Sequence, residues 1–397
     1  MHRFWRVFYL ISLLGLVGLE FAGCGKGLSG SHCSNANYGE QTLTDTLLQS
    51  TELDVNSCAP PVFHSILSSA NYEAILKLND LSYAVVNEFG HTLNQPYPTH
   101  REIGVIRERI RNHTEWLNLH GWTGHQSIFG RTGLNNVDPD VTCIINSSQA
   151  QRLIVVSFHG SRYGDRSPIN HNGRGDWGAN YDSTPVVPSS LGLTDFPDHV
   201  RIHRGFGNNL ASARVGILEE LDRRIGDLGP EMPIWVLTTG HSKGAGMASL
   251  TAGMVKSHFA SNPSRFAHVK VGGIFYSAPR AYHGDQSEDW LHNLVDRRNL
   301  FRINVHGDPV TVNPGRSEGY RSVGILLLDS IWAVNLRNRQ SYGGTANSWL
   351  NTDEWANFHY GSGGRGVGYE FDPAVVMRHS DLAGGFEEGR LHLKTRN

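Results

Sequence analysis

The sequence predicts an α/β fold: a mainly parallel central sheet with helices on both faces and a loop-rich C-terminus. Short apolar runs read as buried strands, segments with helical spacing separate them, and small or polar residues follow each run. The runs that predict strands lie at residues 153–158, 234–237, 269–276 and 300–305. Strands that alternate with helices in this way favour a parallel, doubly wound sheet.

The N-terminus predicts export. A start with two arginines precedes an apolar run at residues 8–19, and Ala-Gly-Cys follows it, ending at Cys24. This is the pattern of a secretory signal, and the run is shorter than the roughly 20 residues that span a membrane. The last three residues are similar to a bacterial lipobox, in which Cys24 would be acylated. We therefore expect residues 1–24 to be a signal peptide of a secreted protein or of a lipoprotein in the periplasm or at the cell surface.

The composition indicates which kinds of partner and cofactor to expect. With 35 basic and 37 acidic residues, nothing favours nucleic acid. The 21 histidines are scattered without metal-ligand spacing, so we expect no metal and no other cofactor. Of the four cysteines, Cys33 and Cys58 form the most economical disulfide pair in an oxidising compartment, beside Cys24 and Cys143.

The segment before the first strand divides into two parts. Residues 25–61 are polar and rich in small residues, which indicates a tether. Residues 62–150 are expected to be a mainly helical segment that packs on the domain after it, with one helix over 62–89 that Gly90 ends and another over 106–117.

The α/β domain is expected to occupy residues 151–397. Its first strand ends at His159-Gly160-Ser161, and a long polar segment at 162–199 shows no sustained helical period. Loops of that length in compact domains are usually functional or disordered. A helix follows at 208–225, and beyond Gly324 regularity fades, apart from an apolar run at 325–334.

The stretch at residues 234–251 carries the clearest chemistry. An apolar strand leads into Gly240-His241-Ser242-Lys243-Gly244, and a small-residue helix follows. Strand, G-x-S-x-G and helix together are the context of a nucleophile elbow, in which the serine lies on a sharp, strained turn. The small neighbours let strand and helix approach, and the helix N-terminus faces the developing negative charge. We expect Ser242 to be a nucleophile.

A serine nucleophile of this kind needs an acid and a histidine later in the chain. Asp308 is the expected acid, because it follows the strand at 300–305, where α/β sheets place active-site residues. His379 and His359 both come after it, and we favour His379 as the base with His359 as the alternative. His241 adjoins the serine and is expected to pack rather than react.

The oxyanion hole is expected to use two donors. One is the backbone N–H of Lys243, the residue after the nucleophile. The other comes from the end of the first strand, at His159-Gly160-Ser161, where the Ser161 hydroxyl can contribute.

These segments, taken together, resemble the class 3 lipases, the fungal-type triacylglycerol lipase family of α/β-hydrolases. The resemblance covers roughly residues 151–324 and rests on six stretches in order: SFHGSR, Asp176-Trp177, IHRGF, TTGHSKGAGMASL, YSAPRAY and INVHGDPVTVNP. It implies an α/β-hydrolase fold with Ser242 as nucleophile, Asp308 as triad acid, and Ser161 with Lys243 as oxyanion donors. His379-Ser380 is similar to the family's late histidine segment.

The sequence also departs from the family pattern. His159 replaces the usual arginine, and Lys243 stands where an apolar residue is common. The segment at 162–199 takes the place of the family's lid, but it is polar and lacks the apolar face of a lid that opens on lipid. We therefore expect a short-chain ester or a lysophospholipid to fit better than bulk triacylglycerol, without interfacial activation.

The sequence thus predicts an exported serine ester hydrolase, a lipase or esterase acting on lipid or carboxylic esters, with membrane association if Cys24 is acylated. An acyltransferase would use the same triad and the same acyl-enzyme. A third hypothesis is an inactive hydrolase fold that acts as a surface binding protein, which the intact elbow disfavours.

Overall fold

The computed structural model describes residues 69–93, 100–133, 136–161, 176–304 and 309–328, all within one compact unit, 38–397. The expected signal peptide at 1–24, the tether at 25–61, and Cys24, Cys33 and Cys58 lie outside these residues.

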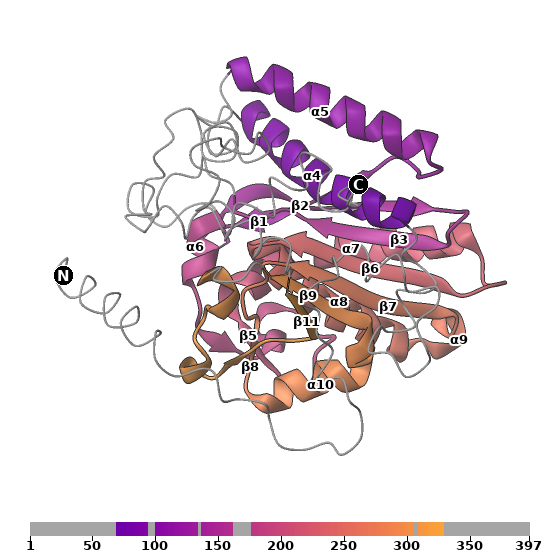
Figure 1. The fold of residues 1–397 in the computed structure, drawn as a ribbon. Coiled ribbons are helices and arrows are strands. Elements are labelled where there is room, and N and C mark those ends of the chain that lie inside the picture. The colour runs from indigo at the N-terminus through magenta and orange to yellow at the C-terminus, as the bar shows by residue number, and fades with distance from the viewer. Residues whose placement is uncertain (1–68, 94–99, 134–135, 162–175, 305–308, 329–397) are drawn as a thin grey trace, which may run out of the picture. The chain divides into compact units, whose positions relative to one another are not determined.

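A seven-stranded sheet forms the centre of the described fold, in the order β1-β2-β3-β6-β7-β9-β11 (Figure 1). The strands β3, β6, β7, β9 and β11 pair in parallel, and β1 and β2 add to them antiparallel. The mainly parallel sheet is therefore confirmed. The strands are β1 (Gln126–Thr132), β2 (Asp138–Ser148), β3 (Leu153–Phe158), β6 (Ile234–His241), β7 (Val269–Tyr276), β9 (Leu300–Asn304) and β11 (Ile325–Leu328).

The sheet begins earlier than the expected boundary at residue 150. Strands β1 and β2 belong to the same sheet as β3, so that boundary falls inside one sheet. The sequence signal was weak because β2 is buried on both faces yet mixes Cys143 and isoleucines with Thr142, Asn146 and serines. No alternation of polar and apolar residues marks such a strand.

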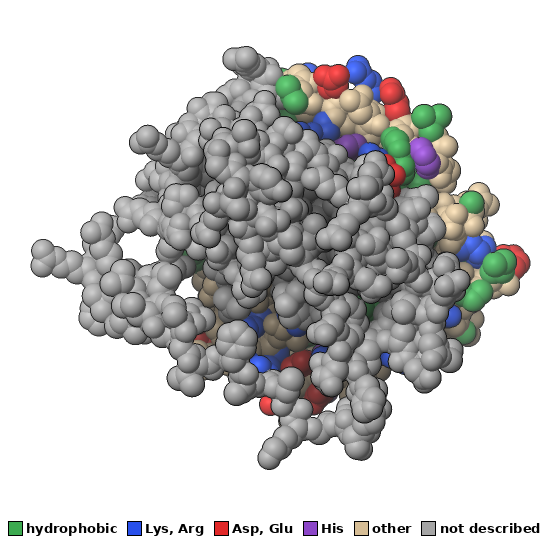
Figure 2. Space-filling view, in the orientation of Figure 1, with side chains coloured by type: hydrophobic (Ala, Val, Ile, Leu, Met, Phe, Trp, Pro, Cys, Tyr) green, Lys and Arg blue, Asp and Glu red, His purple; other side chains and the backbone are tan. Residues whose placement is uncertain are grey.

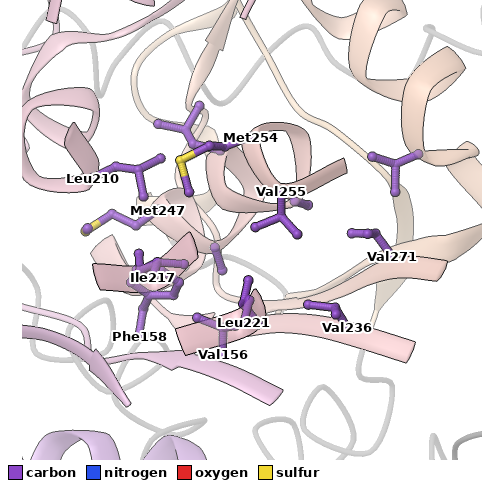
Figure 3. Close-up of a cluster of buried hydrophobic side chains, with 14 of the residues drawn as sticks. Val156, Phe158, Leu210, Ile217, Leu221, Val236, Met247, Met254, Val255 and Val271 are labelled. Atoms are coloured by element: carbon purple, nitrogen blue, oxygen red, sulfur yellow. The ribbon is translucent and has the colours of Figure 1, made fainter. Parts of the chain in front are cut away.

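Helices cover both faces of the sheet (Figure 1). On one side α4 (Ser69–Thr92) contacts β2, β3 and β6, and α5 (His100–Leu119) packs on α4. On the other side lie α7 (Arg204–Leu228) and α8 (Lys243–Ser261), with α10 (Asp285–Val295) against α8. Strand β3 divides its side chains between the two layers: Val155 joins the α4 core, whereas Val156 and Phe158 join the core under α7 and α8 (Figure 3).

The expected helices are present with different bounds. Helix α4 passes through Gly90, which is buried, and ends at Thr92 rather than at the glycine. An isolated glycine weakens a helix by only about 1 kcal/mol, so it does not by itself end one whose apolar face is packed. The helix expected at 208–225 is α7, which begins four residues earlier at Arg204.

Smaller elements surround the parallel sheet. A four-stranded sheet has the order β10-β8-β5-β4, with β10 (Tyr320–Arg321), β8 (Tyr282–His283), β5 (Arg201–His203) and β4 (Pro185–Val186). The segment at 162–199, expected to be irregular, contains α6 (Asp176–Tyr181) and the 3₁₀ helix η3 (Pro188–Leu191). The remaining elements are α9 (Pro263–Phe266), η4 (Arg297–Asn299), η5 (Pro309–Val312) and η6 (Arg316–Glu318).

The described surface shows both signs of charge. Acidic, basic and apolar side chains intermingle over α5 at the upper edge of Figure 2. None of the helices in the described part of the chain combines the length and the apolar character that crossing a membrane requires.

Candidate active site

The candidate nucleophile lies on a strained turn. Ser242 connects the end of β6 to the start of α8 with φ 56° and ψ −128°, which a non-glycine residue rarely adopts. Such a conformation costs on the order of 1–3 kcal/mol and persists only where neighbours enforce it. Here the backbone N–H of Ser242 donates to the carbonyl of Tyr276 on β7 at 3.0 Å. The turn matches the elbow that the sequence predicts.

Two glycines allow the elbow to close. A Cβ on Gly240 would lie 2.5 Å from the carbonyl carbon of Gly244, and a Cβ on Gly244 would lie 2.4 Å from the carbonyl oxygen of His159. Both distances are shorter than any contact that a side chain makes without a shift of the backbone. The first turn of α8 therefore contacts the end of β3 directly, which only glycine permits at these two positions.

The serine lies at the N-terminus of a long helix. Lys243 begins α8, and the N–H groups of Ala245 and Gly246 donate to the carbonyl of Ser242 at 2.9 and 3.2 Å. The N–H of Lys243, in the first helical turn, is one of the amides that a helix leaves without an intrahelical partner. Together with the helix dipole, this favours negative charge next to Ser242.

The second predicted donor lies at the same edge of the sheet. Phe158 of β3 pairs with Gly240 of β6 in parallel, so the residues that follow the two strands emerge side by side. Ser161 is partly buried there, and its Oγ accepts a hydrogen bond of 2.7 Å from Nδ2 of Asn180 on α6. In this orientation the Ser161 proton remains for another acceptor.

The Lys243 side chain does not reach solvent. It is 2% exposed, and its ammonium donates to Oδ1 of Asp176 and lies 4.0 Å from Oδ2 of Asp140. Asp176 begins α6 and also accepts from Thr132 Oγ1 at 2.9 Å. A buried ammonium requires such anionic partners, because desolvation of an unpaired charge is costly.

His159 lies beside the same carboxylates. Its Nε2 lies 3.1 Å from Oδ2 of Asp140, and its Nδ1 lies 2.5 Å from the carbonyl oxygen of Gly160. One ligand atom from each of Asp140, His159 and Asp176 falls within 4.8 Å of the others, a spacing that could hold a cation. The Lys243 ammonium contacts both carboxylates of this group.

His241 is buried, as the sequence predicts for the neighbour of the nucleophile. Its Nδ1 lies 2.8 Å from the hydroxyl of Tyr83 on α4. The same hydroxyl closely approaches Gly160, where a Cβ would lie 1.9 Å from it. Helix α4 therefore supports the elbow from the side of the sheet opposite α8.

The remaining predicted site residues are not among those described. Asp308, His379 and the alternative base His359 lie outside the described residues. Strand β9, which precedes Asp308, pairs in parallel with β7 and ends at Asn304, on the carboxyl edge where Ser242 lies.

Sequence reasoning missed the partners of the predicted donors. Asp140, Asn180 and Tyr83 had no recognised motif, because their contacts join segments that are far apart in the chain. Asp176 belongs to the Asp176-Trp177 stretch of the resemblance, but the sequence did not indicate its contact with Lys243. The one available signal for these partners was Lys243 itself, which stands where an apolar residue is common. A lysine buried at the start of a small-residue helix requires a buried anion beside it.

The chain matches a known family over its central part. Residues 172–318 match the family model described as Lipase (class 3). This range contains Ser242, Lys243, Asp176 and Asp308. No curated protein matches the sequence.

Similar solved structures come from fungi. A mutant of MDLA from Penicillium cyclopium is 17% identical with a TM-score of 0.42, over 66% of this chain and 81% of that one. The lipase from Rhizopus microsporus var. chinensis is 16% identical with a TM-score of 0.41, over 67% of this chain and 76% of that one. The mono- and diacylglycerol lipase from Aspergillus oryzae is 16% identical with a TM-score of 0.41, over 66% and 79%.

Proposed function

We propose that this chain, whose residues 172–318 match the class 3 lipases, is a carboxylic ester hydrolase with Ser242 as its nucleophile. The observation that carries the proposal is the backbone of Ser242, strained at φ 56° between β6 and α8 and enclosed by glycines that no other residue can replace. A strained serine at a helix N-terminus on the carboxyl edge of a parallel sheet has the geometry of a nucleophile elbow.

The reaction follows from this arrangement. His379, or His359 in its place, takes the Ser242 proton while Oγ attacks the ester carbonyl, and Asp308 orients the imidazole. The tetrahedral oxyanion is stabilised by the N–H of Lys243 and the hydroxyl of Ser161. The alcohol leaves with the proton from the histidine, and water then releases the acid from the acyl-enzyme.

The contact between Asn180 and Ser161 supports the second donor. Because the Asn180 amide donates to Ser161 Oγ at 2.7 Å, the hydroxyl proton can turn toward an oxyanion. Loss of one such donor typically lowers kcat by about 10²- to 10³-fold.

For the substrate we propose an ester of a short acyl chain or a lysophospholipid. The support is the polar composition of residues 162–199, which lack the apolar face of a lid that opens on lipid. Transfer of the acyl group to an alcohol or lysophospholipid uses the same first half-reaction, so only the acceptor separates a hydrolase from an acyltransferase.

We also propose that the protein is exported. The support is the basic start and apolar run of residues 1–24, and acylation of Cys24 would add membrane association.

Labelling with a fluorophosphonate tests the nucleophile. The chain lacking residues 1–24 should be labelled, Ser242→Ala should not be, and His379→Ala should lose labelling if it is the base, whereas His359→Ala should retain it. Ser257→Ala, also on α8, is the matched control and should be labelled like the parent. An unlabelled but folded parent would reject the hydrolase and favour the surface binding protein.

Product analysis separates the two enzyme classes. With a short-chain ester in water, a hydrolase releases free acid. If added glycerol or lysophospholipid takes most of the acyl group at low millimolar concentration while free acid disappears, the chain is an acyltransferase.

A further inference from the structure

Four buried ionisable side chains adjoin the elbow, and we refer to them as the charge cluster. Lys243, Asp176, Asp140 and His159 are each 2% exposed or less. They come from four separate elements: the start of α8, the start of α6, β2, and the residue after β3. Burial of so many ionisable groups in one place is costly unless they are paired, so the cluster requires an explanation.

The members of the cluster are one another's polar partners. Lys243 contributes one positive charge between two carboxylates. His159 has an oxygen atom beside each ring nitrogen, Asp140 Oδ2 at 3.1 Å and the Gly160 carbonyl at 2.5 Å. Each of the four buried side chains thus meets a polar partner in the cluster or in the adjoining backbone, which burial requires.

The cluster is also connected to both proposed oxyanion donors. Lys243 supplies one of them from its own backbone, and Ser161 follows His159 by two residues. Helix α6 contacts both sides, since its Asp176 binds the ammonium and its Asn180 donates to Ser161 Oγ. The distance between the two donors is therefore linked to the ion pairs of the cluster.

We propose that Lys243 is a positioning residue as well as a backbone donor: its ammonium, held by Asp176 and Asp140, fixes its own N–H relative to Ser161. This proposal rests on the proposed function. A buried ion pair contributes little net stability over an apolar pair of similar volume, so stability alone does not account for a lysine here. A displacement of about 1 Å at a reacting centre, by contrast, can lower the rate by up to about 10²-fold.

Lys243→Met tests the proposal, because it removes the ammonium while keeping the unbranched stem of the side chain and the backbone N–H. With p-nitrophenyl butyrate as substrate, kcat should fall about 10- to 100-fold while KM changes by less than about twofold. The inhibition constant of a trifluoromethyl ketone, whose adduct places an oxyanion in the hole, should rise by the same factor as kcat falls. Lys256→Met on the same helix is the matched control and should leave all three constants unchanged.

A charge-balanced double variant separates positioning from folding. Lys243→Met with Asp176→Leu removes one ion of each sign and leaves the pair of His159 and Asp140. The thermal midpoint should return to within a few degrees of the parent's, while kcat and the inhibition constant stay at the values of Lys243→Met. Recovery of kcat together with stability would overturn the proposal, and this variant carries the test if the single variant fails to fold.

Three further outcomes are decisive. A parent that resists fluorophosphonate would overturn the proposed function itself, whereas an active parent matched in kcat and inhibition by Lys243→Met would overturn the positioning role alone. Dialysis of the parent against a chelator should not change kcat. A loss of kcat that Zn²⁺ or Ca²⁺ restores would assign the cation position among Asp140, His159 and Asp176 to a metal and overturn the role of Lys243.

Discussion

At the residue scale, Ser242 shows most directly how function opposes stability. Its φ of 56° is disfavoured for any residue with a Cβ, yet it presents the hydroxyl at the end of β6. A glycine would relieve the strain, but it would remove the hydroxyl. The strain is maintained by packing that the serine itself does not provide, from Gly240, Gly244 and the carbonyl of Tyr276.

This strain has a measurable consequence. Ser242→Gly should be more stable than Ser242→Ala by about 1 kcal/mol, because release of the left-handed backbone outweighs the greater freedom of glycine in the unfolded chain. Both variants should lack fluorophosphonate labelling. Urea unfolding of the two variants gives the difference in free energy.

A control position should show the opposite difference in stability between glycine and alanine. At Ser257, inside α8, glycine should be less stable than alanine by about 1 kcal/mol. If alanine is also the more stable residue at position 242, the turn is not strained in solution.

At the element scale, the IHRGF stretch contains the residue that caps helix α7. His203 caps α7: its Nδ1 accepts from the N–H of Phe206 at 3.4 Å, and its ring stacks on Phe206 at 3.9 Å between centroids. Burial lowers the pKa of His203 from 6.5 to about 3, although Asp182 opposes this. The ring is therefore neutral in the folded protein at neutral pH, as a hydrogen-bond acceptor must be.

Acid should weaken the fold through this cap. Between about pH 6.5 and pH 3 the unfolded chain binds a proton at His203 that the folded chain does not, so the free energy of unfolding falls as pH falls. From pH 7 to pH 5 the loss should be about 2 kcal/mol. Urea unfolding at both pH values measures it.

His203→Asn supplies the comparison. Asparagine caps helices well but does not titrate in this range, so the variant should lose less stability between pH 7 and pH 5. Some dependence will remain, since burial also lowers the pKa of His292 to about 4. Equal pH dependence in the parent and in His203→Asn would show that the cap is not the source.

At the scale of the whole molecule, the N-terminal helices belong to the same folding unit as the elbow. Leu81 of α4 is fully buried and joins Val155 of β3 and Leu237 of β6 in one core. Leu81→Ala should lower the free energy of unfolding by about 2–5 kcal/mol. Val105→Ala, 53% exposed on α5, should change it by less than about 0.5 kcal/mol.

A shared core also predicts one transition. Tryptophan fluorescence and fluorophosphonate labelling should be lost at the same urea concentration in the parent, and both midpoints should shift together in Leu81→Ala. Labelling that survives after the fluorescence transition would mean that the elbow folds without α4.

Much of the architecture was readable because it depends on local patterns. The apolar runs predicted β3, β6, β7 and β9, and the glycines around Ser242 predicted the elbow that the structure contains. Strands β1 and β2 were not predicted. Strand β2 is buried on both faces and carries no alternation of polar and apolar residues. In β1 only Ile128 and Thr132 are buried, so its sequence shows no apolar run. The strands of the second sheet pair with segments that are distant in the chain. They are two or three residues long, which is too short for a periodic pattern of polar and apolar residues.

The sequence by itself determined the turn at Ser242 and the positions of β3, β6, β7 and β9 along the chain, because each depends on neighbouring residues. Only the tertiary structure decided what surrounds Ser242. The four residues of the charge cluster come from separate elements, and the fold buries them together so that the Lys243 ammonium meets two carboxylates. Contacts of this kind arise from the sheet and its layers, which bring distant segments to one edge.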